Sequence, residues 1–206
     1  CIRDSEYAKY MLNNKKHVLC EKPAVLKKAQ AEELYSLAKE NNVVFMEAVK
    51  TAYCPGFHAM MAAAKSGKIG RIIDVEAAFS RLTPVNTREY MAQDYNGSFL
   101  EFGSYVCMPV FELLGCDYDD VRFHSMRAVN GVDAYTKAVF SFGGKSAEVK
   151  TGLGVKTEGQ LLISGTNGYI LAKSPWWLTK EFEIRYEDPN KKEVYKYAYE
   201  GSGLQY

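Results

Sequence analysis

The sequence predicts an α/β fold in two parts, a short parallel sheet followed by an α+β domain with a large, mainly antiparallel, open-faced sheet. In residues 1–50, short continuous apolar runs alternate with helical patterns, which is typical of βαβ units. After Pro55, polar and apolar residues alternate along successive strands, which is typical of an antiparallel sheet with one open face. We therefore expect a domain boundary near residue 50, with domains at 1–50 and 51–206.

The first part reads as helix, strand, helix, strand, with helices covering both sheet faces. The expected elements are an opening helix to Asn13-Asn14, a strand at His17–Cys20, a helix at Leu26–Asn41 and a strand at Val43–Met46. Two strands are too few for a stable sheet of this type. We therefore expect further strands upstream and a chain that is a piece of a longer protein.

The second part begins with a helix at Gly56–Ser66 and continues mostly as strands. The expected strands are Ile72–Ser80, Val121–Val129, Ala134–Phe142, Ala147–Thr151 and Gln160–Ser164, with a helix at Ser104–Leu114 between the first two. The dipeptide Asn167-Gly168 predicts a hairpin turn with φ > 0. The aromatic tail after Glu193 contains no expected closing element, which predicts a truncated C-terminus.

Composition excludes several classes of partner. The formal net charge is +1 and the charges are interleaved, so nothing favours a nucleic-acid partner. The five cysteines are odd in number and form no C-x-x-C, which predicts buried free thiols and a cytoplasmic location. The three histidines lie far apart, so no metal site is expected, and no apolar run is long enough to cross a membrane.

The tripeptide Glu21-Lys22-Pro23 ends the first apolar run. In open α/β sheets, ligands bind outside the carboxyl ends of parallel strands, which is where this tripeptide falls. Pro23 fixes its own φ and disfavours helical geometry at Lys22, so the ammonium would be held in an extended loop. Taken alone, however, the tripeptide is better explained as a helix-entry turn with a solvated Lys22.

Several ordered segments resemble the Gfo/Idh/MocA oxidoreductases, in particular the members that act on sugars or dihydrodiols. They are KKHVLCEKP, VVFMEAVKTAYCPGF, SGKIGRIIDVEAAF, GSFLEFGSYV and ISGTNGYI, and the resemblance extends from about Ser5 to Leu171. The resemblance implies the C-terminal part of a Rossmann domain followed by a substrate domain. It also implies NAD or NADP as cofactor, a carbohydrate-like substrate, and a homodimer or higher oligomer formed through the open sheet face.

The resemblance also implies roles for individual residues. The family's Glu-Lys-Pro lies beside the nicotinamide and its lysine is catalytic, which points to Glu21, Lys22 and Pro23. A second family motif, Gly-Gly-x-Leu-x-Asp-x-Gly-x-His/Tyr, reads NGSFLEFGSY at residues 96–105. It implies that Tyr105 is the acid/base residue, whereas Glu101 stands where Asp is commoner, which puts its substrate contact in doubt. Lys15 replaces the usual glycine of a turn.

The chemistry of this set can be derived without the family. Oxidising an alcohol with a nicotinamide requires a base for the hydroxyl proton. A free tyrosine titrates near pH ~10, and an ammonium within about 4–6 Å lowers that value. Lys22 could thus favour the Tyr105 phenolate and also stabilise developing alkoxide charge.

Other residues are weaker candidates. Lys50, just past the second strand, could approach the cofactor or be solvated. Trp176-Trp177 could stack on a sugar but is better explained as an edge-strand packing pair. Gly152-Leu153-Gly154 lacks the third glycine of a dinucleotide loop, so we expect the chain alone to bind cofactor weakly and to be inactive.

Three readings of function remain open. The first is a dehydrogenase or reductase of a sugar, polyol or dihydrodiol. The second is a non-catalytic binding or dimerising module, and the third is a glycosidase of the same fold that uses bound NAD. The choice between NAD and NADP and the direction of the reaction are also open.

Overall fold

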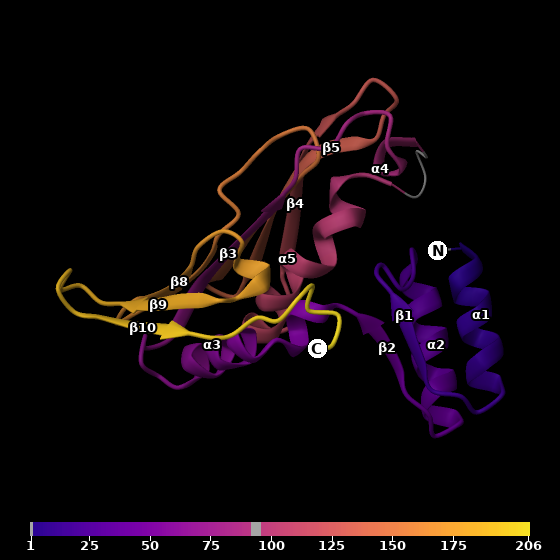
Figure 1. Ribbon diagram of the computed structural model, residues 1–206, viewed down its shortest axis with the longest axis horizontal. Helices are drawn as coiled ribbons and strands as arrows, with labels where there is room; N and C mark the ends of the chain where they lie inside the picture. The colour runs from indigo at the N-terminus through magenta and orange to yellow at the C-terminus, as the bar shows by residue number, and fades with distance from the viewer. Residues whose placement is uncertain (1, 92–95) are drawn as a thin grey trace. The chain divides into compact units, whose positions relative to one another are not determined.

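The computed structural model describes residues 2–91 and 96–206, with side chains from residue 5 onward (Figure 1). It divides into two compact units, which we call unit 1 (residues 1–49) and unit 2 (residues 50–206). Unit 1 contains a two-stranded parallel sheet and unit 2 an eight-stranded, mostly antiparallel sheet. These two sheets confirm the predicted fold class.

Unit 1 follows the predicted order of elements. They are α1 (Ile2–Asn13), β1 (Val18–Glu21), α2 (Lys28–Glu40) and β2 (Phe45–Ala48), and β1 pairs with β2 in parallel. Side chains of α1 and α2 share one core with Cys20 and Phe45. Both helices therefore pack on the same face of the sheet, whereas we predicted that helices would cover both faces. The right-handed crossover between neighbouring parallel strands explains the difference, because it puts successive helices on one side. On the other face, Leu19 is 66% exposed.

Unit 2 is built around a sheet with the strand order β10-β9-β8-β7-β3-β6-β5-β4, in which only β3 and β6 pair in parallel. The strands are β3 (Ile72–Ser80), β4 (Asp120–Arg127), β5 (Asp133–Phe142), β6 (Lys145–Gly152), β7 (Leu161–Gly165), β8 (Tyr169–Ala172), β9 (Glu181–Arg185) and β10 (Lys192–Lys196). The helices are α3 (Pro55–Lys65), α4 (Arg88–Met91) and α5 (Ser98–Leu114), with short 3-10 turns η1 (Lys50–Tyr53) and η2 (Trp176–Leu178). Strand β3 has the predicted bounds.

The two faces of this sheet differ sharply in chemistry. Alternate residues such as Val75, Phe140 and Val149 are buried in the core that α3 and α5 also enter. On the other face, Glu148 forms ion pairs with Lys137 and Lys150, the latter at 2.6 Å. This alternation produces the open, polar-lined face that the sequence predicts.

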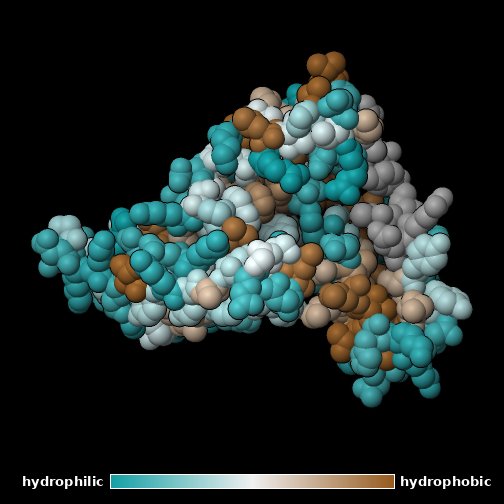
Figure 2. All heavy atoms as spheres, in the orientation of Figure 1, coloured by the Kyte–Doolittle hydropathy of each residue, from teal (hydrophilic) through white to brown (hydrophobic). Residues whose placement is uncertain are grey.

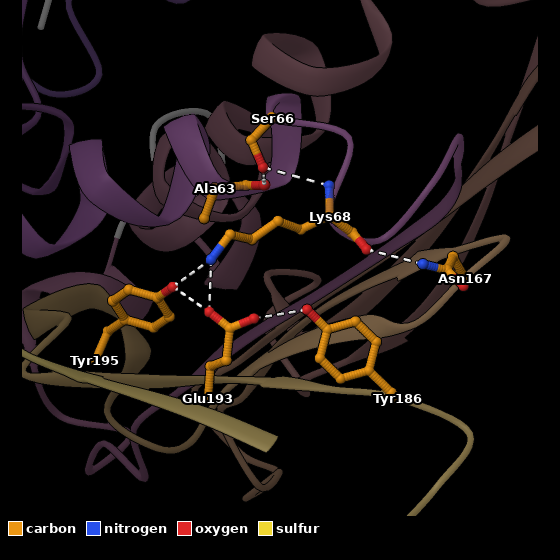
Figure 3. Close-up of polar contacts among 7 residues, drawn as sticks. All are labelled: Ala63, Ser66, Lys68, Asn167, Tyr186, Glu193 and Tyr195. Atoms are coloured by element: carbon orange, nitrogen blue, oxygen red, sulfur yellow. Dashed lines mark hydrogen bonds and ion pairs between the residues drawn. The ribbon is translucent and has the colours of Figure 1, made fainter. Parts of the chain in front are cut away.

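A polar cluster fastens strand β10 to the loop that follows α3 (Figure 3). The Lys68 ammonium donates to Glu193 Oε2 at 2.5 Å and to Tyr195 Oη at 2.7 Å, and the Tyr186 hydroxyl donates to Glu193 Oε1 at 2.7 Å. The hydrogen bonds from Lys68, Tyr195 and Tyr186 lower the pKa of the Glu193 carboxyl to about 2. Beyond this cluster, the β9–β10 hairpin ends in a tip covered with hydrophilic side chains (left in Figure 2).

Several sequence predictions about unit 2 were wrong in detail. Helix α5 begins at Ser98 rather than Ser104. Strand β10 was not among the predicted strands and forms at the start of the aromatic tail. Trp176 and Trp177 lie in η2 rather than in an edge strand, because Trp176 is buried and donates from Nε1 to the Ala78 carbonyl at 2.9 Å.

The hairpin at Asn167-Gly168 forms, but neither residue has positive φ. Gly168 is needed for space instead, since a Cβ there would lie 2.5 Å from the Arg185 carbonyl oxygen of the neighbouring strand.

The described cysteines carry free thiols, as predicted, but they are not all buried. Cys20 and Cys54 are buried, Cys107 is half-buried and Cys116 is exposed. Cys1 lies outside the described residues. No helix in residues 2–91 or 96–206 is long and apolar enough to span a membrane.

Candidate functional site

In unit 1, the predicted corner lies where β1 ends. Glu21 is the last residue of the strand and is exposed, while Lys22 and Pro23 are half-buried and joined by a cis peptide bond. The next backbone N–H, that of Ala24, donates to Glu47 Oε1 at 3.1 Å. Glu47 comes from β2, where it is in register with Cys20 of β1. A carboxylate from the neighbouring strand thus fastens the loop that carries Lys22.

Sequence reasoning missed Glu47. The signal was present, because a single acidic residue interrupts the apolar run VVFMEAV at the carboxyl end of the second strand. Parallel strands bring such ends to the same edge of a sheet.

In unit 2, Glu101 and Tyr105 lie on α5 with an i, i+4 spacing and are both half-buried. Residues so spaced share one face of a helix. The Tyr105 ring contacts Phe79 of β3 edge-on, with the ring centroids 5.4 Å apart. This contact places Tyr105 against the carboxyl end of β3, a central strand of the sheet.

Three aromatic rings from different elements form a stack beside Tyr105, and we call it the aromatic wall. Phe79 lies parallel to Trp177 of η2 at 3.7 Å between centroids, and parallel to Phe102 of α5 at 4.2 Å. Trp177 is itself held because its carbonyl accepts a hydrogen bond from the Thr51 hydroxyl at 2.7 Å. The wall gives the Tyr105 face of α5 an apolar, preformed border, as is usual in sites for small molecules.

The carboxylate of Glu101 lies between two arginines. Arg81 Nη2 is 4.0 Å and Arg88 Nη2 is 3.8 Å from its oxygens. Arg81 also pairs with Glu89 at 3.1 Å, and its guanidinium lies 5.8 Å from the centre of the Phe102 ring. The two glutamates and two arginines balance in charge, so this border of the site is polar but formally neutral.

The C-terminal segment also lies near Tyr105, through Tyr199. The Lys50 ammonium donates to the carbonyl of Ser202, which also accepts from the Tyr199 hydroxyl at 3.1 Å. Burial, together with the nearby Cys54 and Tyr105, raises the pKa of Tyr199 to about 12. Burial likewise raises the pKa of the Cys54 thiol.

This segment contributes residues that the sequence did not single out, Tyr199 above all. The prediction for Lys50 was contact with a cofactor; in the structure its ammonium donates a hydrogen bond to the backbone of this segment.

The described residues therefore form two groups. Glu21, Lys22 and Pro23 form one corner of unit 1, and Glu101, Tyr105 and Lys50 lie in unit 2 around the aromatic wall and the C-terminal segment. Within the described ranges, no group of three His, Cys, Asp or Glu side chains could hold a metal ion.

Comparison with known protein families gives two matches in succession. Residues 3–49 match the oxidoreductase family with an NAD-binding Rossmann fold, and residues 57–171 match the GFO/IDH/MocA C-terminal domain.

Curated relatives agree with these matches. The chain is 31% identical over 193 residues to scyllo-inositol 2-dehydrogenase (NADP(+)) IolU of Bacillus subtilis (strain 168), covering 89% of this chain and 57% of that protein. It is 27% identical over 176 residues to trans-1,2-dihydrobenzene-1,2-diol dehydrogenase of Bos taurus, covering 84% and 52%. The chain thus spans little more than half the length of these relatives.

Solved structures share the fold. An NAD binding oxidoreductase from Klebsiella pneumoniae superposes with a TM-score of 0.80 at 18% identity, over 97% of this chain and 58% of that one. Levoglucosan dehydrogenase in complex with NADH gives a TM-score of 0.79 at 17% identity, over 96% and 58%.

Proposed function

The chain belongs to the Gfo/Idh/MocA family of NAD(P)-binding oxidoreductases, and on that premise we propose that the whole protein is an NAD(P)-dependent dehydrogenase or reductase. Its substrate would carry the reacting hydroxyl of a sugar, polyol or dihydrodiol. The observation that carries the proposal is the placement of Glu101 and Tyr105 one turn apart on α5, beside the aromatic wall. A tyrosine next to preformed apolar surface suits a substrate with one reacting hydroxyl and a carbon skeleton to be held.

Lys22 and Tyr105 handle the proton in this proposal. Tyr105 takes the hydroxyl proton as the alcohol is oxidised, or returns it to the carbonyl oxygen in reduction. The Lys22 ammonium favours the phenolate and stabilises negative charge that develops on the substrate oxygen. Glu101 accepts hydrogen bonds from other substrate hydroxyls, with Arg81 and Arg88 offsetting its charge.

The loop after β1 fits the nicotinamide end of NAD or NADP in its chemistry. Glu21, Lys22 and Pro23 lie at the carboxyl end of a parallel strand, and the hydrogen bond from the Ala24 N–H to Glu47 limits movement of the loop. When bound, the cofactor supplies the hydride acceptor or donor. Lys50 would contact the same cofactor from the start of unit 2.

We also propose that residues 1–50 form part of the dinucleotide-binding domain and residues 51–206 the substrate domain, and that the protein is a homodimer or higher oligomer. The open face of the large sheet supports the proposed oligomer, because Glu148, Lys137 and Lys150 on this face offer both signs of charge to a second copy of the chain. Analytical ultracentrifugation of the whole protein would contradict it with a clean monomer.

The proposed reaction is tested by following cofactor absorbance. The whole protein is mixed with NAD or NADP and, in turn, with aldoses, inositols and dihydrodiols. We expect turnover with at least one substrate of these classes. A protein that binds such a ligand but transfers no hydride would instead be a binding module. Hydrolysis of a glycoside that depends on bound NAD would favour the glycosidase.

A further inference from the structure

The N-cap position of helix α5 is held by a residue with no side chain to cap the helix. The residue before its first turn is Gly97, which has no side chain to accept a backbone N–H of the helix. In most helices a Ser, Thr, Asp or Asn at this position accepts the N–H of the second or third residue. The first turn of α5 therefore needs an acceptor from elsewhere in the fold.

Asp133, on strand β5, is that acceptor. Its Oδ2 accepts the backbone N–H of Phe99 at 3.0 Å and the hydroxyl of Ser98 at 2.6 Å. Ser98 and Phe99 are the first two residues of α5, so the carboxylate occupies the place of an N-cap side chain. Its negative charge is also favourable there, because a helix N-terminus carries partial positive charge.

The position of the Asp133 carboxylate explains why residue 97 is a glycine. A Cβ on Gly97 would lie 1.9 Å from Asp133 Oδ1, and Gly97 has φ of +126°, a conformation that other residues rarely adopt. An ordinary N-cap residue would collide with the carboxylate that replaces it. The N-terminus of α5 is therefore capped by a side chain of strand β5 rather than by its own N-cap residue.

The cap is part of a buried network. Thr136 donates to Asp133 Oδ2 at 2.8 Å, and the hydroxyls of Thr151 and Ser98 are 2.9 Å apart. Ser98 and Thr151 are fully buried and Thr136 is 3% exposed. Buried polar groups of this kind are costly when unpaired, so the network has few alternative arrangements. It therefore fixes the start of α5 to both β5 and β6.

We infer that Asp133 is a positioning residue for the proposed reaction, because it fixes the end of the helix from which Glu101 and Tyr105 project. Glu101 is the fourth residue of α5 and Tyr105 the eighth, so both lie within about two turns of the cap. The inference rests on the proposed function only for its effect on catalysis. Its structural part, that Asp133 holds the first turns of α5, stands by itself.

The test uses Asp133→Asn and Asp133→Ala in the whole protein. Asparagine keeps an uncharged acceptor and alanine removes it. A displacement of catalytic groups by about 1 Å can cost about a hundredfold in rate. We expect kcat to fall about tenfold in Asp133→Asn and about a hundredfold in Asp133→Ala, with the KM for cofactor unchanged. The matched control is Asp119→Asn, since Asp119 also accepts a backbone N–H, that of Gly143, but at the turn between β5 and β6.

Amide hydrogen exchange gives a second readout that needs no activity. In Asp133→Ala we expect the amides of residues 98–105 to exchange about tenfold faster, as expected for the loss of a charged acceptor, while those of α3 keep their wild-type rates. If this variant does not fold, Ser98→Ala removes one of the two α5 contacts to Asp133. It should shift kcat and exchange in the same direction by less.

The outcomes separate cleanly. Slower turnover with faster exchange confined to α5, and neither change in Asp119→Asn, supports the inference. Wild-type exchange in α5, or faster exchange throughout unit 2, overturns it. If the wild type turns over no substrate, the proposed function fails, and the exchange measurement alone decides whether Asp133 holds α5.

Discussion

Replacing Phe79 with leucine should damage the site more than the fold. The substitution keeps a large apolar side chain but removes the ring that joins the aromatic wall. Phe79 contacts Trp177, Phe102 and Tyr105 at centroid distances of 3.7, 4.2 and 5.4 Å. Each aromatic pair contributes about 0.5–1.5 kcal/mol beyond buried area. Contacts that share one ring are not additive, so we expect a loss of about 2 kcal/mol in the free energy of unfolding.

The assay compares Phe79→Leu with a matched control, Phe182→Leu. Phe182 lies on β9 and stacks on Tyr195 at 4.8 Å and on Tyr197 at 6.1 Å between ring centroids. Unfolding in urea is followed by tryptophan fluorescence, which reports on unit 2 because both tryptophans lie there. Activity is measured on the same preparations.

We expect both variants to lose similar stability but only Phe79→Leu to lose activity, by about tenfold in kcat/KM, which corresponds to roughly one lost ring contact. Equal activity in the two variants would refute the role assigned to the aromatic wall. A stability loss below about 0.5 kcal/mol in Phe79→Leu would refute the energetic reasoning.

Three further predictions concern stability and reactivity. Because the carboxyl pKa of Glu193 is lowered to about 2, the contribution of Glu193 to folding stability is present above pH ~4.5 and is lost as the pH falls toward 2. The difference in the free energy of unfolding between wild type and Glu193→Gln should therefore narrow over that pH range. A difference that stays constant with pH would contradict this prediction. Lys15 has φ of +56°, so Lys15→Gly should raise the urea midpoint of unit 1, by about 0.5 kcal/mol in free energy; an unchanged or lower midpoint counts against this. Burial raises the pKa of the Cys107 thiol to about 12, so iodoacetamide near neutral pH should alkylate the exposed Cys116 well before Cys107. Peptide mapping measures the order of alkylation, and finding Cys107 alkylated first would contradict the prediction.

The central elements of the fold could be predicted because their residues alternate in a way that only one secondary structure allows. In β3, Val75 and Ala77 face the core while Asp74 and Glu76 face the other side, and the predicted bounds of this strand are those observed. The i, i+4 spacing of Glu101 and Tyr105 is likewise visible in the sequence, although Glu101 lies before the predicted start of the helix.

The start of α5 could not be predicted, because its cap lies on another strand. Asn96-Gly97 reads as a loop, and the acceptor for Phe99 is Asp133, 34 residues further along the chain. The stack of Trp177 on Phe79 depends in the same way on tertiary packing, since it joins η2 to β3. Strand β10 was missed because its exposed and half-buried residues alternate at the edge of the sheet, where charged side chains obscure the apolar pattern.

The central claim is that Lys22 and Tyr105 act as one proton-handling unit in hydride transfer. The most direct measurement is kcat for Lys22→Met, Tyr105→Phe and the double variant of the whole protein, with cofactor affinity measured alongside. Each single substitution should lower kcat about a hundredfold or more. The double variant should lose far less than the product of the two losses, and Tyr105→Phe should leave cofactor affinity almost unchanged. Wild-type turnover in Tyr105→Phe, or fully multiplicative losses in the double variant, would contradict the claim.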